Sequence, residues 1–199
     1  MASIVFVCTG NLCRSPQAEQ YFRAQSTKAQ EEFGGLSIDV SSAGSRTRDG
    51  LQMPAPAHRW AENLGGDPSR HLSRQLTTEI VESADLLIAL ARDHRATIAK
   101  LSPRAARRTF TLLEFERIVT GSDGSSLADG PPDNGNLIAW RDHAAAHRGL
   151  FVGTPEADSV VDPIGLDEDT YERSARSIFI AVEGIIRTFY GTTHRAPAH

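Results

Sequence analysis

Near the start of the chain an apolar run leads into a small polar loop and then a helix, in the order Ile4-Val5-Phe6-Val7, Cys8-Thr9-Gly10-Asn11-Leu12-Cys13, Arg14-Ser15-Pro16. The apolar run predicts a buried strand. Residues 17–33 predict a helix with Pro16 in its first turn, where the missing N–H of proline costs nothing. The stretch therefore predicts a strand, a tight loop and a helix N-terminus in direct succession.

The loop has the residue types of an oxyanion site. Backbone N–H groups of a tight loop can surround phosphate oxygens, and the dipole of the following helix favours negative charge there. Gly10 and Asn11 tolerate the positive φ that such a loop needs. Arg14 can hold two phosphate oxygens in a planar fork. The same positive field stabilises a thiolate, so we expect Cys8 to be a nucleophile, with the Ser15 hydroxyl hydrogen-bonded to it or capping the helix.

Taken alone, a cysteine and an arginine at this spacing recur by chance, and a cysteine ending a strand is usually a small apolar core residue. The strand, loop and helix together favour the catalytic interpretation. They also resemble the N-terminal signature of the low-molecular-weight protein tyrosine phosphatase family at every position that carries chemistry. The resemblance implies a phosphate-binding loop made by Thr9, Gly10, Asn11, Leu12, Cys13 and Arg14.

The same resemblance implies a role for each loop residue. Cys8 would attack phosphorus, Arg14 would clamp the phosphoryl group, Asn11 would hold the loop shape and Ser15 would support the thiolate. The implied reaction is hydrolysis of phosphotyrosine in a protein or peptide through a cysteinyl-phosphate intermediate, with inorganic phosphate as product. Neither a cofactor nor a metal is expected.

The rest of the chain alternates strand and helix patterns, which predicts a single α/β domain with a four-stranded parallel sheet flanked by helices. The resemblance implies that this sheet is of the flavodoxin-like, phosphotyrosine phosphatase I-like type. Ligands of such sheets bind at the carboxyl ends of the strands, where the Cys8 loop lies. The predicted strands are 4–7, 36–42, 86–90 and 108–111, and the predicted helices are 17–33, 55–64, 77–82, 92–101, 112–119, 136–147 and 168–189.

Residues 117–160 interrupt this alternation of strands and helices. They contain a polar Gly/Pro-rich loop at 120–132, an amphipathic helix and a second loop. Compact relatives join the flanking elements by a shorter path, so we interpret 117–160 as an insertion in a domain spanning 1–191. It could be a surface decoration or a rim on the active site. Residues 192–199 are expected to form a frayed tail.

A phosphatase of this kind needs a general acid, because the leaving phenoxide must be protonated. Asp162, followed by Pro163, is the best candidate because it lies before the C-terminal helix, at the place of the family's acid loop. Asp-Pro alone is usually a turn. The neighbouring Asp158 and Asp167 are interpreted as solvated loop residues.

A third constellation supports the loop without reacting. His71, at the start of a polar stretch that ends in the helix cap Thr77, matches a family histidine that organises the catalytic loop. An ordinary turn is the alternative. Ser42 matches a serine that ties the loop to the second strand. For the other histidines, including His58 and His94, no partner is identified, and most of them are expected at the surface.

The sequence departs from the family pattern in three places. Ile164 and Gly165 stand where the acid loop often carries tyrosines, so one aromatic wall of the cleft is lost. Ala91 replaces an aspartate that steadies the catalytic loop in some members. Residues 46–48 (Arg-Thr-Arg) replace aromatic residues after the second strand, and a basic rim there would favour acidic phosphopeptides.

Composition excludes several classes of protein. The chain has 199 residues and a formal net charge of -4, which argues against nucleic acid as a general partner. No apolar run approaches the ~20 residues of a membrane span. The N-terminus enters a strand without a basic region or cleavage site, so we expect no secretory signal, no membrane insertion and a cytoplasmic protein.

The two cysteines lie five positions apart in one loop, which favours redox or catalytic thiols in a reducing compartment. Cys13 is expected to trap an oxidised Cys8 as a disulfide, although it could simply fill space behind the loop. An arsenate reductase of the same fold remains an alternative, in a form that uses an external thiol because no cysteine follows Cys13. A binding module that retains the loop without catalysis is disfavoured by Cys8, Arg14 and Asp162 together.

Overall fold

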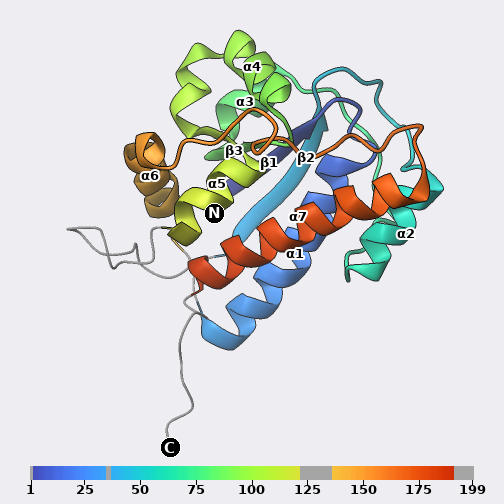
Figure 1. The fold of residues 1–199 in the computed structure, drawn as a ribbon, viewed down its shortest axis with the longest axis horizontal. Coiled ribbons are helices and arrows are strands. Elements are labelled where there is room, and N and C mark those ends of the chain that lie inside the picture. The colour runs from blue at the N-terminus through green and yellow to red at the C-terminus, as the bar shows by residue number, and fades with distance from the viewer. Residues whose placement is uncertain (1, 35–36, 122–135, 191–199) are drawn as a thin grey trace, which may run out of the picture.

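The fold was obtained as a computed structural model, which describes residues 2–34, 37–121 and 136–190. Strands and helices alternate along the chain (Figure 1). The strands are β1 (Ala2–Cys8), β2 (Ile38–Gly44), β3 (Leu86–Ala89) and β4 (Thr109–Thr111). The α-helices are α1 (Arg14–Phe33), α2 (Ala55–Asn63), α3 (Thr78–Ser83), α4 (Arg92–Leu101), α5 (Leu112–Gly121), α6 (Leu137–His147) and α7 (Glu168–Phe189), and the two 3-10 turns are η1 (Pro103–Arg108) and η2 (Arg148–Leu150).

The four strands form one parallel sheet in the order β2-β1-β3-β4, so the predicted α/β architecture is confirmed. Cys8 pairs with Gly44 in the register of β1 and β2. Because all strands run in the same direction, their carboxyl ends meet at one edge of the sheet, and the loop after Cys8 lies there. The sequence placed most element ends within a few residues, while both 3-10 turns were missed.

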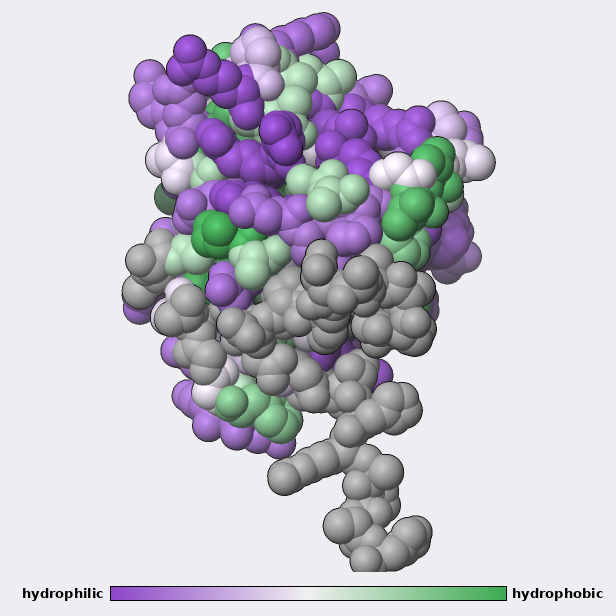
Figure 2. All heavy atoms as spheres, turned by 90° about the vertical axis from the view of Figure 1, so that its left-hand side faces the viewer, coloured by the Kyte–Doolittle hydropathy of each residue, from purple (hydrophilic) through white to green (hydrophobic). Residues whose placement is uncertain are grey.

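Both faces of the central strands are buried, which explains their continuous apolar runs. On one face Ile4 and Phe6 belong to the larger core, which α1, α5 and α7 complete. On the other face Val5 and Val7 pack with apolar residues of α3 and α4. Figure 1 shows α1 and α7 side by side on one side of the sheet and α3 and α4 on the other. The outer surface over α4 is largely hydrophilic (upper part of Figure 2).

Helix α6, from the predicted insertion, is part of the main core. Leu137, Trp140 and Ala144 are buried, and the Trp140 ring stacks on Phe189 of α7 with centroids 5.6 Å apart. This helix therefore contributes to packing and is more than a surface decoration. Most of the predicted polar loop and the predicted tail lie outside the described residues.

After α6 the chain returns across the sheet edge before α7 begins (Figure 1). The N–H of Val160 donates to the carbonyl oxygen of Leu90, just after β3, over 2.9 Å. This bond fixes the segment that leads to Asp162 beside the carboxyl ends of β1 and β3.

Candidate active site

The loop between β1 and α1 wraps around the Cys8 sulfur. The backbone N–H of Asn11 points at the Cys8 Sγ over 3.3 Å, and the Ser15 Oγ lies 3.0 Å from the same sulfur. Asn11 has a φ of 52°, in the left-handed region that few residues other than glycine adopt. Asparagine tolerates this region better than most side chains, which explains its place at the turn.

The side chain of Asn11 is buried and fully used. Its Nδ2 donates to Ser15 Oγ over 3.0 Å and to Ser42 Oγ over 2.7 Å. Its Oδ1 accepts from the backbone N–H of Arg74 over 2.9 Å, and its carbonyl oxygen lies 2.8 Å from the Nε2 of His71. The loop is therefore tied to α1, to β2 and to the 71–77 stretch through a single residue.

Two members of this network were not identified from the sequence. Ser42 Oγ donates to the buried carboxylate of Glu19 over 2.5 Å, and the Arg74 Nε donates to the Ser42 carbonyl over 2.7 Å. Glu19 lies in an otherwise ordinary helix, so no local pattern marks it. Arg74 lies in the polar 71–77 stretch, where the sequence indicated a role for His71 alone.

Arg14 joins the loop to the segment after α6. Its guanidinium is buried; Nη1 donates to the Val160 carbonyl over 3.1 Å and Nη2 to the Asp162 Oδ2 over 2.5 Å. The Asp162 side chain is 41% exposed and so can reach a ligand from solvent. The structure thus brings Cys8, Arg14 and Asp162 to one place.

A cavity of about 280 Å³ opens above this loop. Its walls combine the loop with three side chains of different character: apolar Leu12 and Ile164, and basic Arg46. Arg46 belongs to the predicted basic rim, and its backbone N–H donates to the Thr9 carbonyl over 2.9 Å. The remaining lining residues are Cys8, Thr9, Gly10, Cys13, Arg14 and Asp162.

His94 is an exception to the expectation that most of the remaining histidines lie at the surface. Its side chain is buried in the first turn of α4, and its Nε2 lies 2.9 Å from the Thr9 Oγ1 of the loop. Burial, followed by the nearby charge of Arg14, lowers the pKa of His94 to about 4. The imidazole is therefore neutral at physiological pH. His58, by contrast, is partly exposed and lies 3.4 Å from Glu62.

Cys13 points away from solvent into a small apolar cluster with Met53, Ala57, Ala61 and Tyr171. Burial is the main cause that raises the pKa of its thiol to about 12, and the charge of Cys8 adds to it. Both cysteines are free thiols in the structure. Cys13 also lines the cavity, so packing and a redox role are both compatible with its position.

The interpretation of Asp158 as a solvated loop residue is wrong. Its side chain is only 3% exposed and pairs with Arg92 and Arg117. Burial alone would raise the pKa of this carboxyl, but the hydrogen bonds from Arg117 and Arg92 outweigh it and lower the pKa. Asp167 is exposed and caps α7 by accepting from the Thr170 N–H.

Comparison with known proteins identifies the class to which this fold and loop belong. The sequence model of the low molecular weight phosphotyrosine protein phosphatases matches residues 3–128, and the chain belongs to this family. It is therefore a phosphatase of the low-molecular-weight class.

Individual relatives differ in the substrate that their names give. A protein-arginine-phosphatase of Bacillus subtilis is 40% identical over 125 residues, covering 62% of this chain and 77% of the relative. A low molecular weight protein-tyrosine-phosphatase of Streptomyces coelicolor is 30% identical over 134 residues, covering 60% and 73%. A crystal structure of a Bacillus subtilis YwlE mutant superposes with a TM-score of 0.67 at 27% identity, covering 94% of this chain and 97% of that one.

A second solved structure bears on the chemistry of the loop. It is described as a YwlE arginine phosphatase mutant with a phosphorylated active-site serine, and it superposes with a TM-score of 0.66 at 27% identity over 97% of both chains.

Within the described part of the chain, the helices lack the length and apolar character needed to cross a bilayer.

Proposed function

We propose that this protein is a protein tyrosine phosphatase that works through a phosphorylated Cys8. The observation that carries the proposal is the convergence of the Cys8 sulfur, the Arg14 guanidinium and the Asp162 carboxyl at one cavity. Phosphoryl transfer needs three groups: Cys8 supplies the nucleophile, Arg14 binds the equatorial oxygens and Asp162 donates the proton.

In the first step the Cys8 thiolate attacks phosphorus, so an S–P bond forms and the P–O bond to the tyrosine ring breaks. Arg14 and the N–H groups of the loop hold the three equatorial oxygens, and protonated Asp162 gives its proton to the leaving phenolate. In the second step water attacks phosphorus and passes a proton to Asp162. The S–P bond breaks, and inorganic phosphate and the Cys8 thiolate are released.

The cavity walls favour phosphotyrosine among possible substrates. Leu12 and Ile164 offer apolar surface to a flat, neutral ring. Cys8 is buried at the floor of the cavity. A phosphoserine, whose phosphate lies close to its backbone, would need the peptide to enter the cavity, whereas a phenyl phosphate reaches the floor from outside.

Phosphoarginine is the second candidate, and it is favoured by the 40% identity to a protein-arginine-phosphatase. A phosphorylated guanidino group keeps several N–H donors that need acceptors when they are desolvated. Asp162 is the single carboxylate among the residues that line the described cavity, and Arg46 adds positive charge beside it. The cavity therefore supports tyrosine over arginine.

Hydrolysis of two peptides of identical sequence, one carrying phosphotyrosine and the other phosphoarginine, tests the choice. We expect kcat/KM to favour the phosphotyrosine peptide by roughly a hundredfold, the size of a difference of about 3 kcal/mol. The reverse preference assigns the enzyme to arginine. A phosphoserine peptide of the same sequence should be the poorest of the three.

The Leu12→Ala and Ile164→Ala variants connect the preference to the walls. Each should raise KM for phosphotyrosine several-fold and leave the phosphoarginine rate nearly unchanged. Leu166→Ala serves as the control, because Leu166 is an exposed apolar residue of the same segment and does not line the cavity.

Arsenate reduction with an added thiol, measured on the same preparations, would reveal the alternative function as an arsenate reductase. We further propose that the enzyme acts in the cytoplasm, since its nucleophile must stay a reduced thiol.

A further inference from the structure

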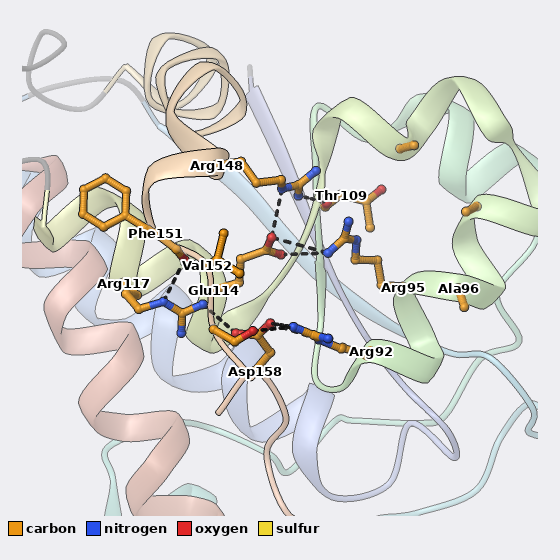
Figure 3. A pocket seen from close by; sticks show the side chains of 13 residues that line it. Arg92, Arg95, Ala96, Thr109, Glu114, Arg117, Arg148, Phe151, Val152 and Asp158 are labelled. Carbon is orange, nitrogen blue, oxygen red and sulfur yellow. Dashed lines mark hydrogen bonds and ion pairs between the residues drawn. The ribbon is translucent and has the colours of Figure 1, made fainter. Parts of the chain in front are cut away.

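A second cavity, of about 540 Å³, opens beside the segment that runs from Phe151 to Asp158 (Figure 3). Its walls come from α4, α5, η1 and the chain that follows α6. None of its lining residues lines the cavity above Cys8. The lining residues are Arg92, Arg95, Ala96, Ala99, Ala106, Thr109, Glu114, Arg117, Arg148, Phe151, Val152, Gly153 and Asp158.

The charges in this cavity do not balance. Arginine contributes four of the lining side chains, and the acidic side chains are two, Glu114 and Asp158. Both acids are almost fully buried, with 7% and 3% of their side chains exposed. Figure 3 shows the labelled guanidinium groups on opposite sides of these two carboxylates. The walls therefore keep an excess of two positive charges.

The arginines of the cavity are paired with the two carboxylates to different degrees. Asp158 receives close hydrogen bonds from Arg92 and Arg117, at 2.5 Å and 2.6 Å. Arg95 is paired more loosely, because its Nη1 stays 3.3 Å and 3.4 Å from the two oxygens of Glu114. The excess charge therefore lies near Arg95, whose side chain is 36% exposed to the cavity and solvent.

Arg148 reinforces this excess. Its Nε lies 2.9 Å from Glu114, and its guanidinium stacks over the Phe110 ring at 4.1 Å. The Nε is buried without a well-aligned hydrogen bond. Burial is the main cause that lowers the pKa of Arg148, and the charge of Arg95 adds to it. Glu114 places one negative charge between Arg95 and Arg148, and a further anion beside the two arginines would relieve the repulsion that remains between them.

We propose that this cavity is a second anion site, which takes a phosphate-bearing ligand with two negative charges. The planar guanidinium group of arginine can donate two parallel hydrogen bonds to phosphate oxygens, and a ligand with two negative charges would neutralise the excess positive charge of the walls. The alanines of α4 and η1 with Phe151 and Val152 give an apolar surface for the organic part of such a ligand. The ligand is either a free phosphorylated compound or a second phosphate on the protein substrate.

We expect a ligand in this cavity to affect catalysis through residues 158–162, the segment that ends at Asp162. Asp158, gripped by Arg92 and Arg117, lies four residues before Asp162, and Ser159 Oγ accepts from the Arg92 N–H over 3.4 Å. A ligand that forms ion pairs with Arg92 or Arg117 would weaken the hydrogen bonds that these two arginines donate to Asp158, and so would loosen the segment that leads to Asp162. The expected effect is on kcat, because binding to the loop around Cys8 is left intact.

Binding of inorganic pyrophosphate, followed by calorimetry at 0.15 M salt, tests the proposal. We expect two pyrophosphates per wild-type chain, one at the Cys8 loop and one at the arginine cavity. Ala96→Glu adds a negative charge at an exposed helix position that lines the cavity, so it should remove one of the two or weaken it at least tenfold. Ala96→Gln has the same size without the charge and should keep both.

Arg95→Gln gives an independent variant, which should weaken the same site, and Arg104→Gln is its matched control. Arg104 carries the same charge on the adjacent η1 turn but does not line this cavity. Circular dichroism and thermal unfolding verify that each variant is folded. A wild-type chain that binds a single pyrophosphate, or an Ala96→Glu chain that still binds two with unchanged affinity, overturns the proposal. Equal weakening by Arg104→Gln also overturns it, since that result indicates general electrostatic attraction.

Two kinetic arms identify the source of the ligand. If it is free, pyrophosphate alters kcat for p-nitrophenyl phosphate in the wild type and not in Ala96→Glu. If it belongs to the substrate, doubly phosphorylated peptides have a higher kcat/KM than singly phosphorylated ones, and Ala96→Glu removes the difference. The absence of both effects contradicts the expected link to the segment that ends at Asp162 and overturns that part of the proposal.

Discussion

The Nη2 of Arg14 donates to the Oδ2 of Asp162 over 2.5 Å, joining two residues that are 148 positions apart in the chain. This pair places the proposed general acid beside the proposed phosphoryl clamp. A phosphate in the loop would compete with Asp162 for the same guanidinium. The Asp162 carboxyl would then be released toward the leaving group at the moment when a proton is needed.

Asp162→Asn should slow hydrolysis in proportion to the basicity of the leaving group. For phosphotyrosine we expect kcat to fall by on the order of a hundredfold or more, because the phenolate leaves unprotonated. For p-nitrophenyl phosphate the fall should be much smaller. Rates across a series of aryl phosphates measure this slope. Asp169→Asn, at an exposed position of α7, is the control with the same charge change. Equal losses across the series would assign Asp162 a structural role.

Cys8→Ser should abolish turnover and keep anion binding. The serine hydroxyl is a far weaker nucleophile than a thiolate, so kcat should fall by roughly ten-thousandfold or more. Arg14 and the loop N–H groups remain, so phosphate or vanadate should bind within a few-fold of the wild-type affinity. Calorimetry with vanadate and a phosphatase assay measure the two quantities. Near-normal turnover in this variant would contradict the mechanism.

The architecture could be read from the sequence because it depends on local patterns. Continuous apolar runs at residues 4–7 and 86–90 indicate strands covered on both faces, and the structure buries both faces. The loop around Cys8 could be predicted because the residues that form it lie close together in the sequence. Element ends were less well placed, because the last turn of a helix or the last pair of a strand depends on partners elsewhere.

The environments of His94 and Asp158 could not be predicted in this way. Each is polar and stands in a polar stretch, so exposure was the reasonable expectation. His94 is buried because α4 starts directly behind the loop that contains Thr9. Asp158 is buried because Arg92 and Arg117 come to it from two other helices. Such burial depends on residues distant in sequence, which single-sequence patterns do not record.

Asn11 should matter both for its hydrogen bonds and for its backbone conformation. Asn11→Ala removes the amide that joins Ser15, Ser42 and Arg74, and it places alanine at a φ of 52°. We expect a loss of about 3 kcal/mol in unfolding free energy and at least a tenfold fall in kcat. Asn11→Gly loses the same hydrogen bonds but accepts the φ, so it should be more stable than the alanine variant by about 1 kcal/mol. Urea unfolding measures both, and equal stability would show that the backbone carries no strain.

His94 should make the protein less stable as the pH falls from 6.5 toward 4. In that range the unfolded chain binds a proton on His94 that the folded chain does not, because the pKa in the fold is about 4. Stability therefore rises with pH across this window and is fully present above it, with a contribution of up to about 3 kcal/mol. His94→Gln keeps a partner for Thr9 but cannot titrate. Denaturant unfolding between pH 4.5 and 7.5 should show a flatter profile for this variant, and parallel profiles would refute the shifted pKa.

Cys13 should determine how the enzyme survives oxidation. Peroxide converts a loop thiolate to a sulfenic acid, and a neighbouring thiol can displace its hydroxyl to form a disulfide and water. We expect peroxide to inactivate the wild type reversibly, with dithiothreitol restoring activity. Cys13→Ser should have near-normal activity before treatment and recover poorly afterwards.

The high pKa of Cys13 gives this prediction a pH signature. Its thiol is largely protonated at neutral pH, because burial raises its pKa to about 12. Attack requires the thiolate, so disulfide formation after peroxide treatment should accelerate about tenfold for each unit of pH between 7 and 9. Mass spectrometry of samples quenched with acid follows the Cys8–Cys13 bridge. Full recovery of Cys13→Ser, together with no bridge in the oxidised wild type, would establish that Cys13 only packs against Met53 and Tyr171.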